Sequence, residues 1–247
     1  MNHGIYVATS GFVSQQRRLE IIANNLANAN TTGYKGDLPV FRVSTPPRSG
    51  SWPGEAQPLW VPIFVNEPTL AIDFSQGPLM ETGNPLDVAI VGEGFFEIET
   101  SQGMRYTRKG DFTLMNDGSL VTPKGDPVMG EGGTIVLTEG EITIDEEGAI
   151  FVDGNEEGRL RVVTFPDTGN LVKEGEALFA WVGKTAEARP IDQVEIRSGY
   201  LENSNVNPIS EMVQMIETIR TYEAQQKVIH SFDGIRKKAV DEVGRLR

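Results

Sequence analysis

The chain has 247 residues, a formal net charge of −13 and no cysteine. Its acidity argues against binding to duplex nucleic acid or anionic lipid, because both need clustered Lys and Arg. The lack of cysteine excludes disulfides, thiol catalysis and cysteine-ligated zinc. No apolar run is long enough to cross a bilayer, and the N-terminus lacks the early positive charge and apolar stretch of a cleavable signal peptide.

Residues 3–30 are predicted to form a helix. Ile5, Phe12, Leu19 and Leu26 recur every seven residues, and Ile22 lies between them on the same side. This spacing favours a helix that packs along one face against another helix. Gly33 is suited to the left-handed conformation that commonly follows a helix end.

Four asparagines lie near the end of this helix, at positions 24, 25, 28 and 30. Asparagine is a poor helix former because its amide competes for backbone hydrogen bonds. One interpretation is that Asn24, Asn25 and Asn28 fix the register of packed elements through side-chain hydrogen bonds. The alternative is that Asn28 and Asn30 only cap the end of the helix.

The middle of the chain changes in composition. Residues 36–75 contain seven of the 14 prolines, which predicts an extended connector with little regular structure. Residues 76–204 contain short runs of Val, Ile, Phe and Thr between glycine turns, which predicts a β-rich domain. Two hairpins are expected around Gly118 and Gly148.

Residues 208–246 are predicted to form a second helix. Asn207 is suited to the N-cap and Pro208 to the first helical position. Apolar residues then recur at steps of three and four, with Gln226 as an interruption. The two terminal helices are expected to pack together, because each needs a partner for its apolar stripe. The predicted fold class is therefore α+β: a coiled-coil-like helical core of residues 1–35 and 205–247, the connector 36–75, and an inserted mainly-β outer domain of residues 76–204.

Candidate catalytic and ligand-binding patterns are weak. The glycines of Gly92–Phe96 lack the spacing of a phosphate loop, and Asp153–Gly158 lacks the glutamate of a calcium loop. His3 and His230 have no evident carboxylate partners for a metal site. The expectation is therefore a protein that is not an enzyme, with no cofactor, metal or small-molecule substrate.

Four segments resemble the bacterial flagellar rod and hook protein family, in the order seen there. They are IIANNLANANTTGYK, TGNPLDVAIVGEGFF, YTRKGDFTLMNDGSLVTPKGDPV and LENSNVNPISEMVQMIETIRTYEAQQK. The resemblance implies a structural subunit whose terminal helices form a coiled-coil core around the axis, with the β domain outside. It also implies self-assembly, partner rod proteins, passage through the flagellar type III export apparatus without a cleaved signal, and a location in the periplasmic rod.

Within that family, Asp73–Ile90 is most similar to the proximal-rod subclass, and the distal rod is the nearest alternative. A cell-wall carbohydrate-binding or carbohydrate-degrading β protein is an alternative of another class, which would need paired carboxylates in a cleft. The residues expected at the subunit and axial interface are Ile5, Phe12, Leu19, Ile22, Leu26, Asn24, Asn25, Asn28, Ile209, Met212, Ile216, Ile219, Tyr222 and Ile229.

Overall fold

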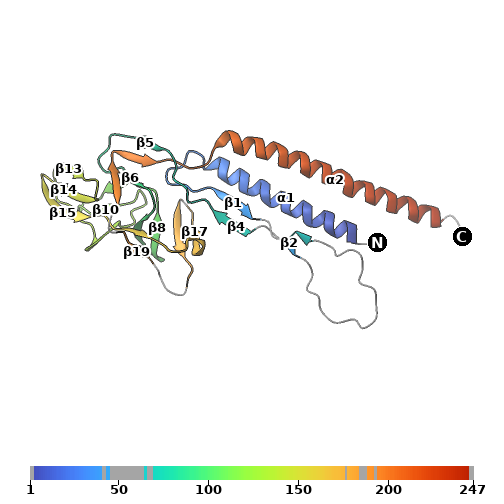
Figure 1. Cartoon of the computed structure of the whole chain (residues 1–247), viewed down its shortest axis with the longest axis horizontal. Coiled ribbons are helices and arrows are strands. Elements are labelled where there is room, and N and C mark those ends of the chain that lie inside the picture. Colours follow the sequence, from blue (N-terminus) through green and yellow to red (C-terminus); the bar gives the residue numbers. More distant parts are fainter. Residues whose placement is uncertain are drawn as a thin grey trace. The chain divides into compact units, whose positions relative to one another are not determined.

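The computed structural model describes residues 3–40, 43–44, 64–65, 69–175, 177–183, 188–191 and 194–244. It contains two long helices and many short strands, which confirms a mixed α+β fold (Figure 1). The chain divides into two compact units. The helical unit comprises residues 1–27, 37–71 and 207–247, and the β unit comprises residues 28–36 and 72–206.

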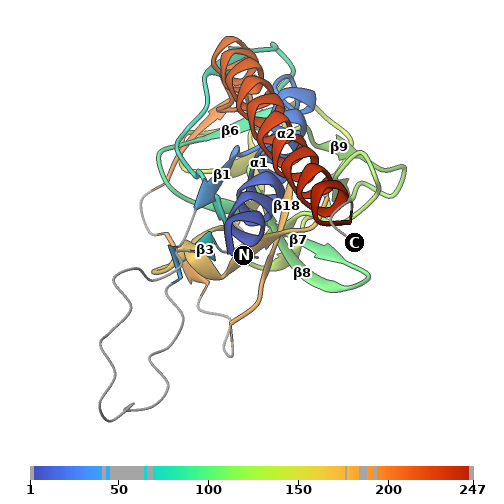
Figure 2. The same cartoon turned by 90° about the vertical axis from the view of Figure 1, so that its right-hand side faces the viewer.

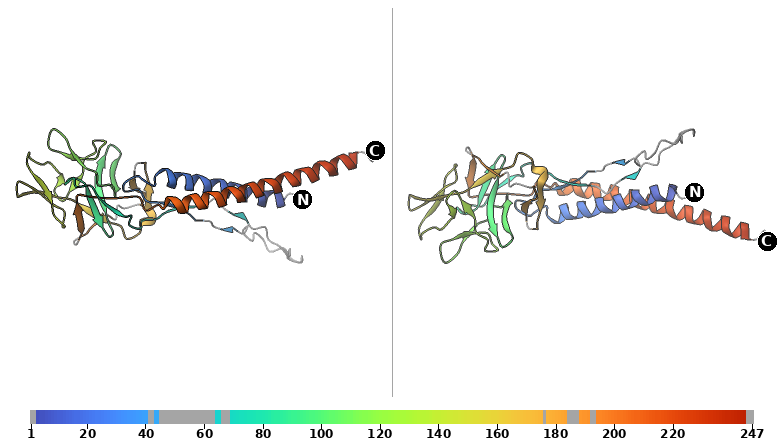
Figure 3. Two further views of the ribbon diagram at one scale, coloured as in Figure 1. Left: turned by 90° about the horizontal axis from the view of Figure 1, so that it is seen from above. Right: turned by 90° about the horizontal axis from the view of Figure 1, so that it is seen from below.

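The helical unit is built on α1 (His3–Ala27) and α2 (Pro208–Gly244). The predicted cap is present at the start of α2, where the backbone N–H groups of Ile209 and Ser210 donate to Asn207 Oδ1 over 3.0 and 3.2 Å. Within this unit the two helices lie side by side in opposite directions (Figures 1 and 3). The end of α2 extends beyond the start of α1, as expected for 37 residues paired with 25.

The first helix is shorter than the predicted 3–30 because residues 28–31 form a turn. The Thr31 N–H donates to the Asn28 carbonyl over 3.1 Å, and Thr31 Oγ1 donates to Asn28 Oδ1 over 3.2 Å. Gly33 then has a φ of 67°, the left-handed exit that its position predicted. Residues 28–36 group with the β unit, where Gly33, Tyr34 and Lys35 are buried.

The described part of the connector forms paired strands. β1 (Asp37–Val40) pairs with β4 (Thr69–Ile72), and β2 (Val43–Ser44) pairs in antiparallel fashion with β3 (Phe64–Val65). These segments are therefore more regular than the proline content predicted. Most of the connector prolines lie outside the described residues.

The β unit contains the remaining strands. Their bounds are β5 Leu79–Glu81, β6 Val88–Val91, β7 Phe95–Thr100, β8 Gly103–Thr107, β9 Thr113–Leu114, β10 Leu120–Val121, β11 Met129–Gly130, β12 Gly133–Thr134, β13 Ile142–Ile144, β14 Ala149–Val152, β15 Asn155–Arg159, β16 Val162–Thr164, β17 Leu171–Lys173, β18 Leu178–Trp181, β19 Arg189–Pro190, β20 Glu195–Ser198 and β21 Tyr200–Glu202, with a short 3₁₀ helix at Thr168–Asn170.

A six-stranded sheet in the order β17-β18-β8-β7-β16-β19 is the largest sheet of this unit. Strands β13, β14 and β15 form a meander, and β6 and β5 pair with the late strands β20 and β21. Figure 2 gives a second view of several of these strands, among them β7, β8 and β18. The β unit thus joins strands from the two ends of its own sequence.

Two apolar clusters form the core of the β unit. The larger cluster includes Val88, Ile90, Phe96, Leu120 and Ile150, each fully buried. The second is aromatic and contains Phe95, Tyr106, Phe165 and Phe179. Both predicted hairpins are present, β9–β10 and β13–β14, and their turn glycines Gly118 and Gly148 have φ values of 83° and 82°.

Candidate subunit interface

The two helices contact each other directly within the helical unit. The rings of Phe12 and Tyr222 have centroids 4.3 Å apart. α1 also packs against strands β1 and β3 of the connector. α1 is therefore covered by more elements of its own chain than α2 is.

The covered side of α2 contains both polar and apolar residues. Its less exposed residues recur at steps of four and three, as in a heptad seam. They are Glu211, Met215, Thr218, Tyr222, Gln225 and Ile229. Only Thr218, which is 2% exposed, is fully buried.

Hydroxyl groups in this seam bond to their own helices. Thr218 Oγ1 donates to the Gln214 carbonyl over 2.7 Å, and Ser14 Oγ donates to the Ser10 carbonyl over 2.9 Å. Such bonds satisfy the hydroxyl but add nothing across the seam. Most of the attraction between the helices must come from the contacts of a few larger side chains, such as the Phe12–Tyr222 ring pair.

The predicted apolar series of α2 lies on an exposed face. Ile209 is 75% exposed, Met212 50%, Ile216 53% and Ile219 40%. The expectation that these residues pack against the N-terminal helix is therefore wrong. Ile209, Met212, Ile216 and Ile219 do not face α1. Tyr222 and Ile229 of the same predicted series are partly buried in the seam, where Tyr222 contacts Phe12. We name Ile209, Met212, Val213, Ile216 and Ile219 the outer apolar face of α2.

The predicted residues of α1 are placed differently. Ile22 is 2% exposed, and Phe12, Leu19 and Leu26 are partly buried. Asn24 is exposed. The side chain of Ile5 lies outside the described residues. The predicted apolar stripe of α1 is thus largely covered by elements of its own unit.

Asn25 links α1 to the connector. Its side chain is 3% exposed, and its amide exchanges two hydrogen bonds with the backbone of Asp37. Nδ2 donates to the Asp37 carbonyl and Oδ1 accepts from the Asp37 N–H, both over 2.9 Å. Asn25 therefore holds the first residue of β1 against the last turn of α1, a bond that could not be foreseen from helical periodicity.

Glu211, in the first turn of α2, interacts with Asn25. Burial raises the pKa of the Glu211 carboxyl, and the hydrogen bond from Asn25 and the nearby Arg18 guanidinium partly oppose that rise. The start of α2 and the end of α1 are thus joined by polar contacts. The remaining predicted asparagine, Asn28, forms the turn after α1.

Asn205 plays a similar part within the β unit. Its Oδ1 accepts from the Gly36 N–H over 2.7 Å, and its Nδ2 donates to the Asp73 carbonyl over 2.8 Å. A buried ionic group lies next to it, formed by Lys35, Arg108 and Glu202. Sequence reasoning missed this group because its members are far apart in the chain. The only sequence signal for this group was that its charged residues lie within segments of otherwise apolar or small residues.

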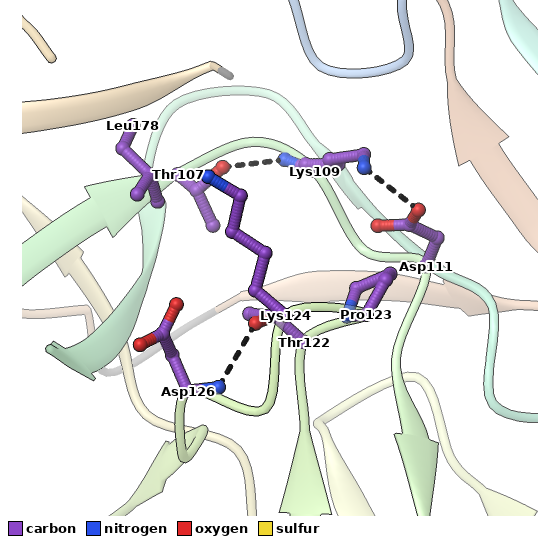
Figure 4. A pocket seen from close by; sticks show the side chains of 8 residues that line it. All are labelled: Thr107, Lys109, Asp111, Thr122, Pro123, Lys124, Asp126 and Leu178. Atoms are coloured by element: carbon purple, nitrogen blue, oxygen red, sulfur yellow. Dashed lines mark hydrogen bonds and ion pairs between the residues drawn. The ribbon is translucent and has the colours of Figure 1, made fainter. Parts of the chain in front are cut away.

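A hollow on the β unit is lined by Lys109, Asp111, Lys124 and Asp126 together with uncharged residues (Figure 4). Lys109 Nζ lies 2.9 Å from Asp111 Oδ2, and the Asp126 N–H donates to Thr122 Oγ1 over 3.2 Å. Among the residues that the structure describes, no group of three His, Asp or Glu side chains is arranged to hold a metal. No described helix is long and apolar enough to span a membrane.

Family models match three parts of the chain. The model of the flagella basal body rod protein matches residues 5–35, and that of the flagellar hook protein FlgE/F/G D1 domain matches residues 89–154. The model of the flagellar basal body rod FlgEFG protein C-terminal matches residues 197–242. The chain is also 35% identical to the flagellar basal-body rod protein FlgF of Caulobacter vibrioides over the full length of both chains. The chain belongs to the flagellar basal-body rod protein family.

Other relatives in this family carry more than one name. The chain is 35% identical to FlgG of Agrobacterium fabrum over 92% of this chain and 94% of that one. It is 30% identical to the flagellar hook-basal body complex protein FlhO of Bacillus subtilis over the whole of both chains. This rod-family chain is therefore a structural protein of the flagellar basal body and not an enzyme. The first and last family matches include α1 and most of α2, the elements of the candidate interface.

Proposed function

We propose that this chain is a proximal-rod subunit that polymerises through its terminal helices. In this proposal α1 and α2 form a coiled-coil core domain, and neighbouring rod subunits cover the outer apolar face of α2. The polymer is the periplasmic drive shaft that transmits torque, and its subunits are copies of this chain together with other rod proteins.

The outer apolar face carries the proposal. Five large apolar side chains lie on it within eleven residues, each at least 40% exposed. Single exposed apolar residues are ordinary, whereas a contiguous set on one helix marks a protein–protein contact. The seam toward α1 already has the four–three spacing of a coiled coil, so a second contact surface on the opposite side suits a helix surrounded by neighbours.

The test is a double substitution on this face, Ile209→Ser with Ile216→Ser. Both side chains are mostly exposed, so the monomer should keep its helix content and thermal stability. Covering two isoleucines contributes roughly 1.5–3 kcal/mol each when burial is complete, so incorporation into rods should fall about tenfold or more. Purified basal bodies, probed for this chain in a strain that lacks the native copy, give the measurement.

Glu217→Gln is the matched control, because Glu217 is exposed on the same helix and, at about 100° per residue, lies away from both the outer apolar face and the seam toward α1. It should leave incorporation unchanged. Normal incorporation of the double variant would refute the role of this face.

The assignment to the proximal rod rests on the similarity of Asp73–Ile90 to that subclass, and the full-length match to a FlgF protein supports it. The distal rod is the second candidate, supported by the equal identity to a FlgG protein. Expression of this chain in strains lacking either the proximal or the distal subunit separates them. Restored swimming in the first strain alone is the expected result.

Location and export follow from the same proposal. The subunit leaves the cytoplasm through the flagellar type III apparatus, its partner during secretion, and keeps its N-terminus. Mass spectrometry of the chain recovered from basal bodies should show an uncleaved start. A secretion mutant of that apparatus should retain the chain in the cytoplasm.

A further inference from the structure

A buried ionic group is centred on Glu202 in the β unit. The side chains of Glu202, Lys35 and Arg108 are 0%, 1% and 4% exposed. Lys35 Nζ donates to Glu202 Oε1 over 2.5 Å, and Arg108 Nη1 donates to Glu202 Oε2 over 3.4 Å. The backbone N–H of Gly77 also donates to Glu202 Oε1, over 2.8 Å. We name Lys35, Arg108 and Glu202 the Glu202 cluster.

The cluster lies close in sequence to three of the four points where the chain passes between its two units. One crossing is between residues 27 and 28, and the three nearer the cluster are between residues 36 and 37, 71 and 72, and 206 and 207. Lys35 precedes the first of these three crossings, and its Nζ also donates to the Ser75 carbonyl, shortly after the second, over 2.8 Å. Glu202 precedes the third. The Glu202 carboxylate therefore connects three segments, and each of these segments leads to one of the three crossings.

Further bonds and close approaches hold the same segments together. Asn205 accepts from Gly36 and donates to Asp73 and Ser75, again linking all three segments. The Gly33 N–H donates to the Glu202 carbonyl over 2.7 Å. A side chain at Gly77 would collide with the Asn203 carbonyl, so the backbones touch there without intervening side chains.

Charged groups are costly to bury, so their presence here calls for a reason. Burial lowers the pKa of Lys35 and of Arg108, while the Glu202 carboxylate opposes the shift in both. Apolar side chains would stabilise such a site equally well. Apolar side chains would not fix the positions of the three segments relative to each other. Hydrogen bonds to a carboxylate do, because they set the distance and direction of each donor.

We propose that Glu202 is a positioning residue that keeps the three crossing segments fixed relative to each other inside the β unit. This inference rests on the proposed function, because a subunit under torque needs crossings that do not shift under load. The cluster contacts β6 directly, because Arg108 Nη1 donates to the Ile90 carbonyl over 3.5 Å, whereas the β13–β14 hairpin is stabilised by the apolar core around Ile144 and Ile150.

Hydrogen exchange on the full-length subunit tests this placement. Glu202→Gln keeps the shape but leaves two buried cations without their counter-charge. Exchange at residues 33–36, 75–77 and 203–206 should become at least about a hundredfold faster. Exchange in β13 and β14, which lie in the apolar core, should change much less. Asn205→Ala leaves no unpaired charge and should make exchange in the same segments about tenfold faster. This variant provides the test if Glu202→Gln does not fold.

The control is Glu174→Gln, which breaks the exposed pair of Glu174 Oε2 with Arg105 Nε at 2.6 Å and should leave these segments unchanged. Unchanged exchange at the crossing segments in Glu202→Gln and Asn205→Ala would overturn the proposal. So would acceleration spread evenly over β13, β14 and the crossing segments, since that result would make Glu202 only a contributor to general stability.

A swimming assay separates this inference from the proposed function. Cells carrying Asn205→Ala should swim normally in dilute medium and slow in viscous medium, where load is high. Equal speeds of variant and wild type at every viscosity would overturn the positioning role while the rod assignment stands. Absence of the wild-type chain from rods would instead overturn the proposed function.

Discussion

Glu97 shows how a single buried carboxyl ties stability to pH. It lies in β7, is 5% exposed, and has Arg161 Nε at 2.9 Å from its Oε2. Burial raises the pKa of Glu97, and the Arg161 charge opposes that rise only partly. The folded chain therefore holds a proton at pH values where the unfolded chain has released it. The stability that this proton contributes is present below the ordinary glutamate pKa and is lost as pH rises through the raised one.

Glu97→Gln should remove this dependence. As pH rises from the ordinary glutamate pKa through the raised pKa of Glu97, the free energy of unfolding of the wild type should fall relative to that of the variant. Urea unfolding at a series of pH values measures the difference. Glu99→Gln, an exposed position on the same strand, is the control and should follow the wild-type profile. Parallel profiles for Glu97→Gln and wild type would contradict the expectation.

At the scale of elements, the sequence predicted the existence of both helices better than their packing. Asn207 and Pro208 correctly marked the start of α2, because caps are local chemistry. The apolar repeat of α2 predicted the wrong packing partner. A repeat shows which residues need to be buried, and it does not show which molecule buries them. Gln226, expected to interrupt the seam, is exposed, and the neighbouring Gln225 is covered.

The side chain of Gln225 lowers the stability of the packing between α1 and α2. Its Oε1 is buried, and no donor among the described residues reaches it. Gln225→Met should therefore stabilise the helix pair by about 1 kcal/mol, because it removes an unsatisfied polar atom and keeps the volume. Thermal unfolding followed by circular dichroism measures the gain, with exposed Gln226→Met as the matched control. A lower melting temperature in Gln225→Met would show that the amide is bonded in solution.

The β unit could be predicted as a class, through its alternating runs and glycine turns, but its ionic centre could not. Lys35 and Glu202 are separated by 167 residues, and no local pattern marks them as partners. The pairings of β5 with β21 and of β6 with β20 were hidden for the same reason. Long-range pairing depends on the whole chain, whereas turns and caps depend on a few neighbours.

At the scale of the whole molecule, the two units should differ in resistance to protease. The helical unit has a seam of mixed polar and apolar residues and an exposed apolar face, while the β unit has two apolar clusters. Limited proteolysis of the monomer should therefore remove α1 and α2 first and leave a fragment near residues 72–206. Segment 28–36 should stay bound to that fragment through Lys35. Mass spectrometry after gel filtration identifies both pieces, and a monomer with protected ends would contradict the order.

The distance in sequence between Lys35 and Glu202 also bears on when the native state is completed. A polypeptide leaves the ribosome N-terminus first, so the ammonium of Lys35 emerges long before its carboxylate exists. Loop closure of this length is entropically costly and comes after local hairpins have formed. The pair can therefore form only once residue 202 is available, and a chain interrupted before that residue leaves Lys35 without its carboxylate partner.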